Sequence, residues 1–227
     1  EQESFAALQA AHDSSAAAIA YDGKSFFSLQ QIEVKQTVYG FGGGVKCSDI
    51  TTNNVQNVFL ISTPNITIYD LTADGQSTIQ SGVANIDPTP WNSTNYDSFL
   101  GSKRGFLVEA TSNVKLTRCI GKNTAGQSGF RTQSSTNVTY DHCTAQRTRG
   151  NSGDGFYSAF GLQVKYIGCR SEDFTRIGFV VESASQTVNH IACYATNGHD
   201  SSINYGGAEF NSGFWTESSF DTKYISL

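Results

Sequence analysis

Six side chains of this sequence lie two or four residues after a repeated glycine and could do chemistry together with Asp173, which is expected at the rim of the same face: Glu109, Arg131, Tyr157, Glu182, Trp215 and Glu217. Aromatic rings pack on the C–H faces of sugars, and carboxylates accept directed hydrogen bonds from hydroxyl groups. A carbohydrate groove is therefore expected. The expected catalytic residues are Glu182, Glu217 and Asp173. The expected substrate-binding residues are Arg131, Tyr157, Trp215 and Glu109.

The two glutamates Glu182 and Glu217 are expected on neighbouring turns of the fold, about 5 Å apart. Carboxylates at such a spacing can hydrolyse a glycosidic bond, and their mutual repulsion raises one pKa, as a general acid requires. A lyase would instead need a base and a cation beside a uronate, and Arg131 with Arg147 or Arg176 could supply the cation. The same face could also be plain solvated surface or a subunit contact, and the residues leave these alternatives open.

A repeat must position these side chains. Five Gly-Phe pairs are followed fourteen or fifteen residues later by a cysteine or leucine, which links Gly105 to Cys119, Gly129 to Cys143, Gly155 to Cys169, Gly178 to Cys193 and Gly213 to Leu227. The stretch from Asn57 to Leu71 has the same shape. The cysteines step by 24, 26 and 24 residues, and a fixed period of this length indicates a repeat architecture.

Each repeat unit holds two short alternating segments separated by a polar corner such as Thr136-Asn137, and alternation with period two indicates strands. Short strands repeating in the mid-twenties, without helices, predict an all-β solenoid with coils of about 24 residues. The glycine is expected to make the corner before each strand. The side chains expected to stack in the lumen are Phe106, Phe130, Phe156, Phe179 and Phe214; Val114, Val138, Val164 and Val188; Tyr140, Tyr166 and His190; and Cys119 to Cys193 between Leu71 and Leu227.

The same template predicts two outward columns on one face. Two residues after the glycine come Phe59, Leu107, Arg131, Tyr157, Val180 and Trp215. Four residues after it come Ile61, Glu109, Gln133, Ala159, Glu182 and Glu217. Asp154 and Asp173 are expected at the rim of this face.

Composition narrows the classes of function. Charged residues make up 15% of the 227 residues, Gly numbers 22, and the net charge is −5. This suits a turn-rich β protein without nucleic-acid partners. No apolar run approaches the ~20 residues of a membrane span. The cysteines lack the CxxC or Cys/His clustering of zinc sites, so they are expected to be buried thiols, and no metal or cofactor is expected.

The chain is expected to divide into an N-terminal cap, residues 1–40, and a solenoid, residues 41–227, which continues beyond residue 227 in a longer protein. The cap should contain one short helix and a strand pair. Residues 76–104 exceed the template and are either an inserted functional loop or an extra irregular coil.

Three segments resemble a known superfamily. "VFLISTPNITIYDLTADG" (58–75) resembles the coils of right-handed parallel β-helix, or pectate-lyase-like, proteins, and "YGFGGGVKCS" (39–48) resembles the passage that leads into their first full coil. "ESFAALQAAHDSSAAA" (3–18) is similar to the helix that caps bacteriophage tailspikes and related polysaccharide-degrading enzymes. The resemblance implies a right-handed parallel β-helix with a short N-terminal helical cap.

The resemblance also implies a function, namely a tailspike-type module that binds a host surface polysaccharide, with or without depolymerising it. It implies a homotrimer on the virion surface or in the extracellular space. A non-catalytic structural or adhesive segment of a larger appendage, and a secreted polysaccharide lyase or hydrolase, are the alternatives. The family's Asp-Pro-His-Glu, Gly-His-Gly and Arg-Ile-Lys segments are absent, so no family catalytic residue is carried over.

Overall fold

The structure is a computed structural model of residues 1–227. It describes residues 4–47, 57–76, 103–149, 153–198 and 212–225, and the backbone of four short strands outside these ranges. Leu227 and most of the segment 76–104 lie outside the described residues.

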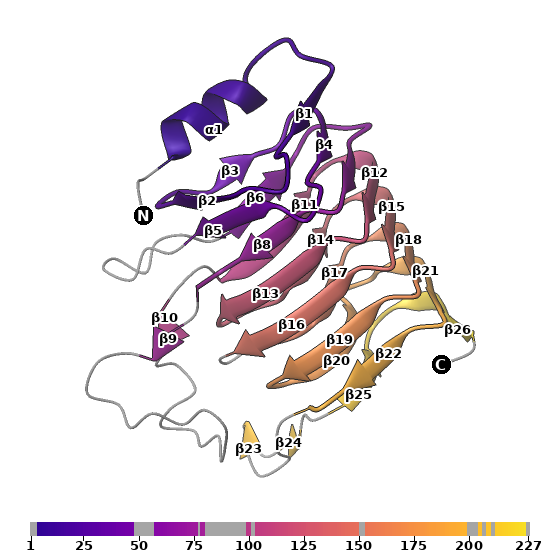
Figure 1. The fold of residues 1–227 in the computed structure, drawn as a ribbon. Helices are drawn as coiled ribbons and strands as arrows, with labels where there is room; N and C mark the ends of the chain where they lie inside the picture. Colours follow the sequence, from indigo (N-terminus) through magenta and orange to yellow (C-terminus); the bar gives the residue numbers. More distant parts are fainter. Residues whose placement is uncertain are drawn as a thin grey trace.

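Three parallel sheets run along the molecule, and the chain visits them in turn (Figure 1). Sheet 1 contains β3 (Ile32–Glu33), β6 (Asn57–Ile61), β11 (Arg104–Glu109), β14 (Phe130–Gln133), β17 (Phe156–Ala159), β20 (Ile177–Glu182) and β25 (Ser212–Thr216). Sheet 2 contains β1 (Ala18–Ala20), β4 (Thr37–Tyr39), β7 (Thr67–Tyr69), β12 (Ser112–Thr117), β15 (Thr136–Asp141), β18 (Leu162–Ile167), β21 (Gln186–Ile191) and β26 (Phe220–Ile225). Sheet 3 contains β2 (Ser25–Ser28), β5 (Gly44–Cys47), β8 (Thr72–Asp74), β13 (Ile120–Ala125), β16 (Thr144–Arg149), β19 (Arg170–Phe174) and β22 (Tyr194–Thr196).

Each coil consists of one strand from each sheet, and successive coils pair in register, as in Phe130 with Phe156 and Val138 with Val164. This arrangement is a parallel β-helix, and it confirms the all-β solenoid with one short N-terminal helix, α1 (Phe5–His12). Two short antiparallel pairs stand apart from the sheets: β9 (Thr78–Ile79) with β10 (Phe99–Leu100), and β23 (Asn204–Tyr205) with β24 (Ala208–Glu209).

The lumen contains the predicted ladders. The Phe rings stack almost parallel, with centroids 4.8 Å apart from Phe130 to Phe156 and again from Phe156 to Phe179. Tyr140 and Tyr166 form a second stack, which His190 continues at 4.8 Å. The centroid spacing equals the distance between neighbouring strands, so each coil contributes one ring to each stack.

The cysteine ladder is also confirmed, and all five cysteines are free and buried. Three of the thiols have the same kind of partner in the preceding coil: the Sγ atoms of Cys143, Cys169 and Cys193 donate to carbonyl oxygens at 3.4, 3.3 and 3.4 Å. Cysteine therefore suits the column because it is small and apolar and still gives a buried carbonyl a weak donor.

Two residues expected on the outer face lie in the lumen instead. Phe59 pairs with Phe106, and Ile61 pairs with Val108, so both point inward and are fully buried. The reason is register. The template aligned Asn57 with Gly105, whereas the structure pairs Asn57 with Arg104, and a shift of one residue moves every side chain of a strand to the other face.

The repeated glycines have a different cause from the one expected. None of Gly105, Gly129, Gly155 and Gly178 adopts the positive φ of a tight corner. A Cβ at Gly155 would lie 2.5 Å from the carbonyl oxygen of Gly178, and one at Gly105 would lie 2.6 Å from that of Gly129. Glycine is required here because the neighbouring coils approach too closely for any side chain.

The corners are made by other residues with left-handed backbone. Between sheets 1 and 2, Asn65, Asn113 and Asn137 have φ of 62°, 57° and 54°. Their side chains form a ladder, in which Asn137 Nδ2 donates to Asn113 Oδ1 at 2.8 Å and Asn113 Nδ2 donates to Asn65 Oδ1 at 3.1 Å. Asparagine tolerates this conformation better than most residues, which confirms the expected polar corner.

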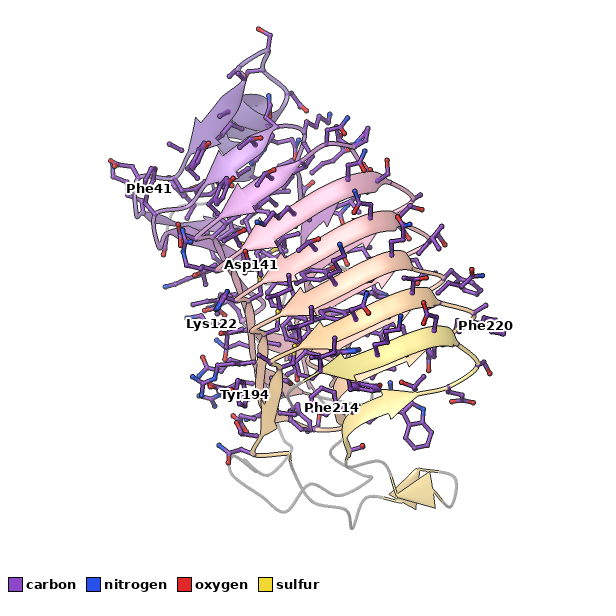
Figure 2. The ribbon with its side chains drawn as sticks, turned by 90° about the vertical axis from the view of Figure 1, so that its right-hand side faces the viewer. Phe41, Lys122, Asp141, Tyr194, Phe214 and Phe220 are labelled. Atoms are coloured by element: carbon purple, nitrogen blue, oxygen red, sulfur yellow. The ribbon has the colours of Figure 1, made fainter. Side chains whose placement is uncertain are left out.

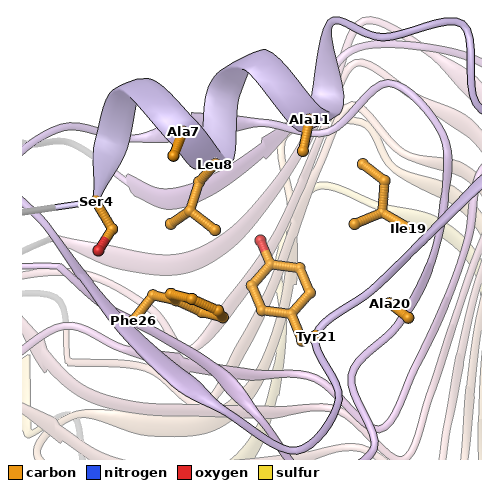
Figure 3. Close-up of a pocket in the computed structure, with 8 residues that line it drawn as sticks. All are labelled: Ser4, Ala7, Leu8, Ala11, Ile19, Ala20, Tyr21 and Phe26. Carbon is orange, nitrogen blue, oxygen red and sulfur yellow. The ribbon is translucent and has the colours of Figure 1, made fainter.

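Helix α1 covers the N-terminal end of the stack (Figure 1). Phe5 and Leu8 pack against the core, and His12 Nε2 shares a hydrogen bond of 3.2 Å with the hydroxyl of Tyr21. Between the helix and the first strands lies a mainly apolar pocket of about 410 Å³, whose lining includes Leu8, Ile19 and Phe26 (Figure 3). In the described part of the chain, no helix has the length and apolarity needed to cross a membrane.

Strands β6, β7 and β8 pair directly with β11, β12 and β13. The coil of β6, β7 and β8 and the coil of β11, β12 and β13 are therefore direct neighbours. Strands β1, β2 and β3, which lie within residues 1–40, pair with β4, β5 and β6 and so belong to the same three sheets.

Candidate functional site

The outer face of sheet 1 brings together six of the seven candidate residues. Arg131 pairs with Tyr157, Tyr157 with Val180, and Val180 with Trp215, so these residues form one column. The column continues from Arg131 through Leu107 and Leu60 to Glu33, and Leu107 and Val180 are buried. Arg131, Tyr157 and Trp215 are each partly exposed and are the accessible members of the column.

The second column runs from Glu109 through Gln133 and Ala159 to Glu182. Val181 pairs with Thr216, and Glu217 N donates to Val181 O at 2.9 Å, so Glu182 and Glu217 are neighbours on adjacent coils. Gly178 and Gly213 are 35 residues apart in the sequence, yet their strands, β20 and β25, are direct neighbours in the sheet. The template predicted this placement of Glu182 and Glu217 on adjacent coils.

Glu182 is the carboxyl group on this face with the environment of an acid. Burial raises its pKa, the carboxylates of Asp154 and Glu217 add to the rise, and Arg131 opposes it. Glu217 is exposed, and its Oε2 accepts a hydrogen bond of 3.3 Å from Trp215 Nε1. The pair therefore combines a half-buried carboxyl whose pKa is raised with an exposed carboxyl on the adjacent coil.

The Arg131 guanidinium contacts neutral side chains. Its guanidinium lies 4.4 Å from the centre of the Tyr157 ring, Nη2 donates to Gln133 Oε1 at 2.8 Å, and Nη1 donates to Gln127 Oε1 at 3.3 Å. Burial lowers its pKa. Among the described residues no carboxylate forms an ion pair with it, so this guanidinium is oriented by amides and a ring and can still bind an anionic or hydroxyl oxygen.

A buried ion pair lies next to this face. Asp154 is 1% exposed, and Arg176 binds it through Nε at 2.8 Å and Nη2 at 2.6 Å. Burial raises the pKa of Asp154, and Arg176 counteracts this. Asp154 is therefore not exposed to a substrate, and it influences Glu182 electrostatically, by raising the pKa of that carboxyl.

Asp173, the seventh candidate, lies elsewhere. It is on β19 in sheet 3, where its Oδ2 accepts a hydrogen bond of 2.6 Å from Arg149 Nη2, and its backbone is left-handed, with φ 58°. Arg149 is itself buried. The position of Asp173 is thus that of a corner residue that neutralises a buried arginine.

Three residues that border the face were not singled out from the sequence. Gln127 orients Arg131 from the loop before β14. Arg104 donates to Asn57 Oδ1 at 3.0 Å, and burial together with nearby Arg131 lowers its pKa to about 10. Phe160, at the end of the Ala159 strand, is exposed with φ 52°. Of these three residues, only Phe160 could have been found from the sequence, because it is a phenylalanine that directly follows an alternating strand.

Comparisons with known proteins support the fold. No family model matches the sequence, and no curated protein matches it. A crystal structure from Parabacteroides merdae ATCC 43184, described as a candidate glycosyl hydrolase, is similar with a TM-score of 0.60 at 14% identity, over 86% of this chain and 90% of that one. ORF18 of Geobacillus virus E2 aligns with a TM-score of 0.33 at 11% identity, over 100% of this chain and 59% of that one. The first likeness shows a shared solenoid fold.

Among the described residues no group of three or more His, Cys, Asp or Glu side chains is arranged to hold a metal ion. The side chains described on the sheet 1 face include the carboxyls of Glu182 and Glu217, the guanidinium group of Arg131 and the rings of Tyr157 and Trp215.

Proposed function

We propose that the outer face of sheet 1 binds a polysaccharide and hydrolyses its glycosidic bonds. The observation that carries the proposal is the adjacency of Glu182 and Glu217 on neighbouring coils, beside the exposed ring of Trp215. A sugar chain laid along the solenoid axis would meet Arg131, Tyr157 and Trp215 in turn. The fold shared with a candidate glycosyl hydrolase is consistent with this activity and does not identify the residues.

In the proposed reaction Glu182 donates its proton to the glycosidic oxygen, and the bond from that oxygen to the anomeric carbon breaks. Glu217 either takes a proton from the water that attacks the anomeric carbon or attacks that carbon itself, after which water releases the sugar. Either route consumes one water per bond. In the second route the water returns the proton to Glu182, whereas in the first route Glu217 keeps the proton of the water and exchange with solvent resets both carboxyls. The anomeric configuration of the first product, measured by NMR, distinguishes the two routes.

The test is the release of reducing ends from a panel of bacterial surface polysaccharides. Glu182→Gln and Glu217→Gln should each lower the rate at least a hundredfold while binding is retained. Glu172→Gln is the matched control, because Glu172 is also partly exposed but lies on β19 in sheet 3. If both sheet 1 variants keep the full rate of the parent, the catalytic groups are elsewhere and the assignment is wrong.

Binding without cleavage is the second candidate function. The hydrogen bond from Trp215 Nε1 holds Glu217 as a fixed acceptor beside an aromatic ring, which is an arrangement that also serves simple sugar recognition. This candidate predicts retention of the protein on a polysaccharide that it does not degrade, and loss of that retention in Trp215→Ala.

We also propose that the module acts as a homotrimer on an extracellular or virion surface. The support is the resemblance of its coils and of its helical N-terminal segment to tailspikes, together with the position of α1 over the end of the stack. A monomeric mass of the full-length protein in light scattering would reject the trimer.

A further inference from the structure

A second cluster of exposed aromatic rings lies far from the sheet 1 face, in the first coils of sheet 2. Tyr39 ends β4 and Tyr69 ends β7, and the two residues pair in register. Their rings are parallel within 7° with centroids 5.1 Å apart, and Phe41 stacks on Tyr39 at 6.2 Å. Tyr39 is 40% exposed and Phe41 is 65% exposed. We call Tyr39, Phe41 and Tyr69 the aromatic platform; Figure 2 shows Phe41 at the surface near the N-terminal end of the stack.

The fold does not require aromatic residues at this place. The same outward column continues from Tyr69 through Thr117, Asp141, Ile167, Ile191 and Ile225. Polar, charged and aliphatic side chains all occupy it, so the column imposes no residue type. The aromatic rings of the first coils are therefore not explained by packing.

The backbone at Phe41 is unusual for a bulky residue. Its φ is 50°, in the left-handed region that glycine and asparagine normally occupy. Two flanking glycines make the turn, and a Cβ at Gly40 would lie 2.2 Å from the carbonyl oxygen of Asp70. Gly40 N donates to Tyr69 O at 2.7 Å, and Gly42 N donates to Asp70 O at 2.8 Å. The turn thus presents an exposed phenylalanine in the left-handed conformation that other corners of this protein also adopt, as at Asp70 and Arg118.

Polar groups stand directly beside the rings. Asp70 follows Tyr69 and accepts hydrogen bonds from Nε and Nη2 of Arg118 at 2.7 and 2.8 Å, and both side chains are partly exposed. Flat rings with an adjoining carboxylate and guanidinium match the two surfaces of a pyranose, whose C–H face is apolar and whose hydroxyl groups both donate and accept. A protein partner would need about 800 Å² on this side, which three rings do not supply.

We propose that the aromatic platform is a second carbohydrate site, which binds one neutral pyranose residue of a polysaccharide by stacking on Phe41 and Tyr39 and by hydrogen bonds to Asp70 and Arg118. The site is separate from the sheet 1 face and does not depend on the cleavage proposed there. Its role is to retain a long glycan while another part of it is bound elsewhere, because two linked sites raise the effective concentration of the second.

Affinity electrophoresis in native gels tests the site, with hydroxyethyl cellulose, xylan, galactomannan or dextran as the embedded probe. All proteins carry Trp215→Ala, so that sheet 1 binding is already weakened. We expect retardation in at least one gel, and Phe41→Ala should raise the apparent dissociation constant at least fivefold. Phe220→Ala is the matched control, because Phe220 is 63% exposed at the other end of the stack, and it should bind like its parent.

A second variant separates binding from folding. Phe41→Gly relieves the left-handed strain, so its melting temperature should equal or exceed that of the parent while retardation is lost. The proposal is overturned if none of the four gels retards the parent, or if Phe41→Ala and Phe41→Gly are retarded as strongly as the parent. Neither result bears on reducing-end release, which tests the sheet 1 site separately.

Discussion

The lumen and the outer face of sheet 1 are built from alternate residues of the same strands, and they differ completely in composition. The inward column of Phe130, Phe156 and Phe179 repeats one residue, and its rings stack at 4.8 Å. The outward neighbours of these three are Arg131, Tyr157 and Val180, which share a column but not a chemistry. Equal spacing therefore does not by itself make residues alike.

The difference shows which positions of a strand are constrained by packing and which are not. A ring in the lumen touches the rings above and below it, so a different residue would leave a cavity or a clash along the whole stack. An outward residue is covered on one side only, and its neighbours can adjust. Repetition in the Phe and Cys columns of the lumen reflects packing, whereas the outward columns of sheet 1 vary and can hold binding residues.

The largest effect is expected when an inward residue is replaced by aspartate, and the same replacement of its outward neighbour is the comparison. Phe156→Asp should cost more than about 4 kcal/mol and unfold the central coils, because an unpaired carboxylate would be buried. Tyr157→Asp should cost about 1 kcal/mol or less, because its side chain can reach solvent. Thermal melts followed by circular dichroism measure both, and equal melting temperatures would contradict the ladder.

Acid should destabilise the fold through two buried histidines, His190 in the lumen and His12 in helix α1. Burial lowers the pKa of His12 and of His190 from 6.5 to about 4. The unfolded chain then binds more protons than the folded one, so stability present above pH 6.5 is lost as the pH falls towards 4, by roughly 3 kcal/mol for each histidine. Urea unfolding at pH 7 and pH 4.5 measures this loss.

His190→Tyr is the matched control for the pH dependence. Tyrosine already occupies the same column at Tyr166 and Tyr224, both of which stack on His190. The variant should lose about half of the pH dependence between 6.5 and 4. If it keeps the dependence of the parent, His190 is not the titrating group.

The corners should show an intermediate effect. Asn137→Ala removes the hydrogen bond to Asn113 and places alanine at φ 54°, so it should cost about 1–2 kcal/mol. Asn137→Gly keeps the backbone conformation accessible and should cost less. Equal losses in chemical denaturation would show that the hydrogen bond, rather than the backbone, determines the residue at this corner.

The smallest effect on stability is expected on the outer face. Trp215→Ala should change the free energy of unfolding by less than about 1 kcal/mol, because the side chain is partly exposed on the last described coil of sheet 1. The same variant should weaken polysaccharide binding at least tenfold, as loss of one stacking ring would. A large loss of stability with unchanged binding would assign Trp215 to packing.

The order of the ladders followed from the sequence alone. The Gly-Phe repeat and the cysteine steps predicted the Phe stack, the Cys ladder and the adjacency of Glu182 and Glu217 across an excursion of the chain. These predictions were possible because a parallel β-helix converts sequence periodicity directly into neighbourhood, with one residue of each column per coil.

Tertiary structure decided what periodicity does not encode. A one-residue difference in register placed Phe59 and Ile61 in the lumen. The alternation of a strand alone does not determine which of its two faces points inward. Asp173 forms an ion pair with Arg149 on sheet 3, and Asp154 forms one with Arg176. Such pairing depends on the distances between coils. The raised pKa of Glu182 likewise arises from burial and from carboxylates that the chain brings close only when the coils are stacked.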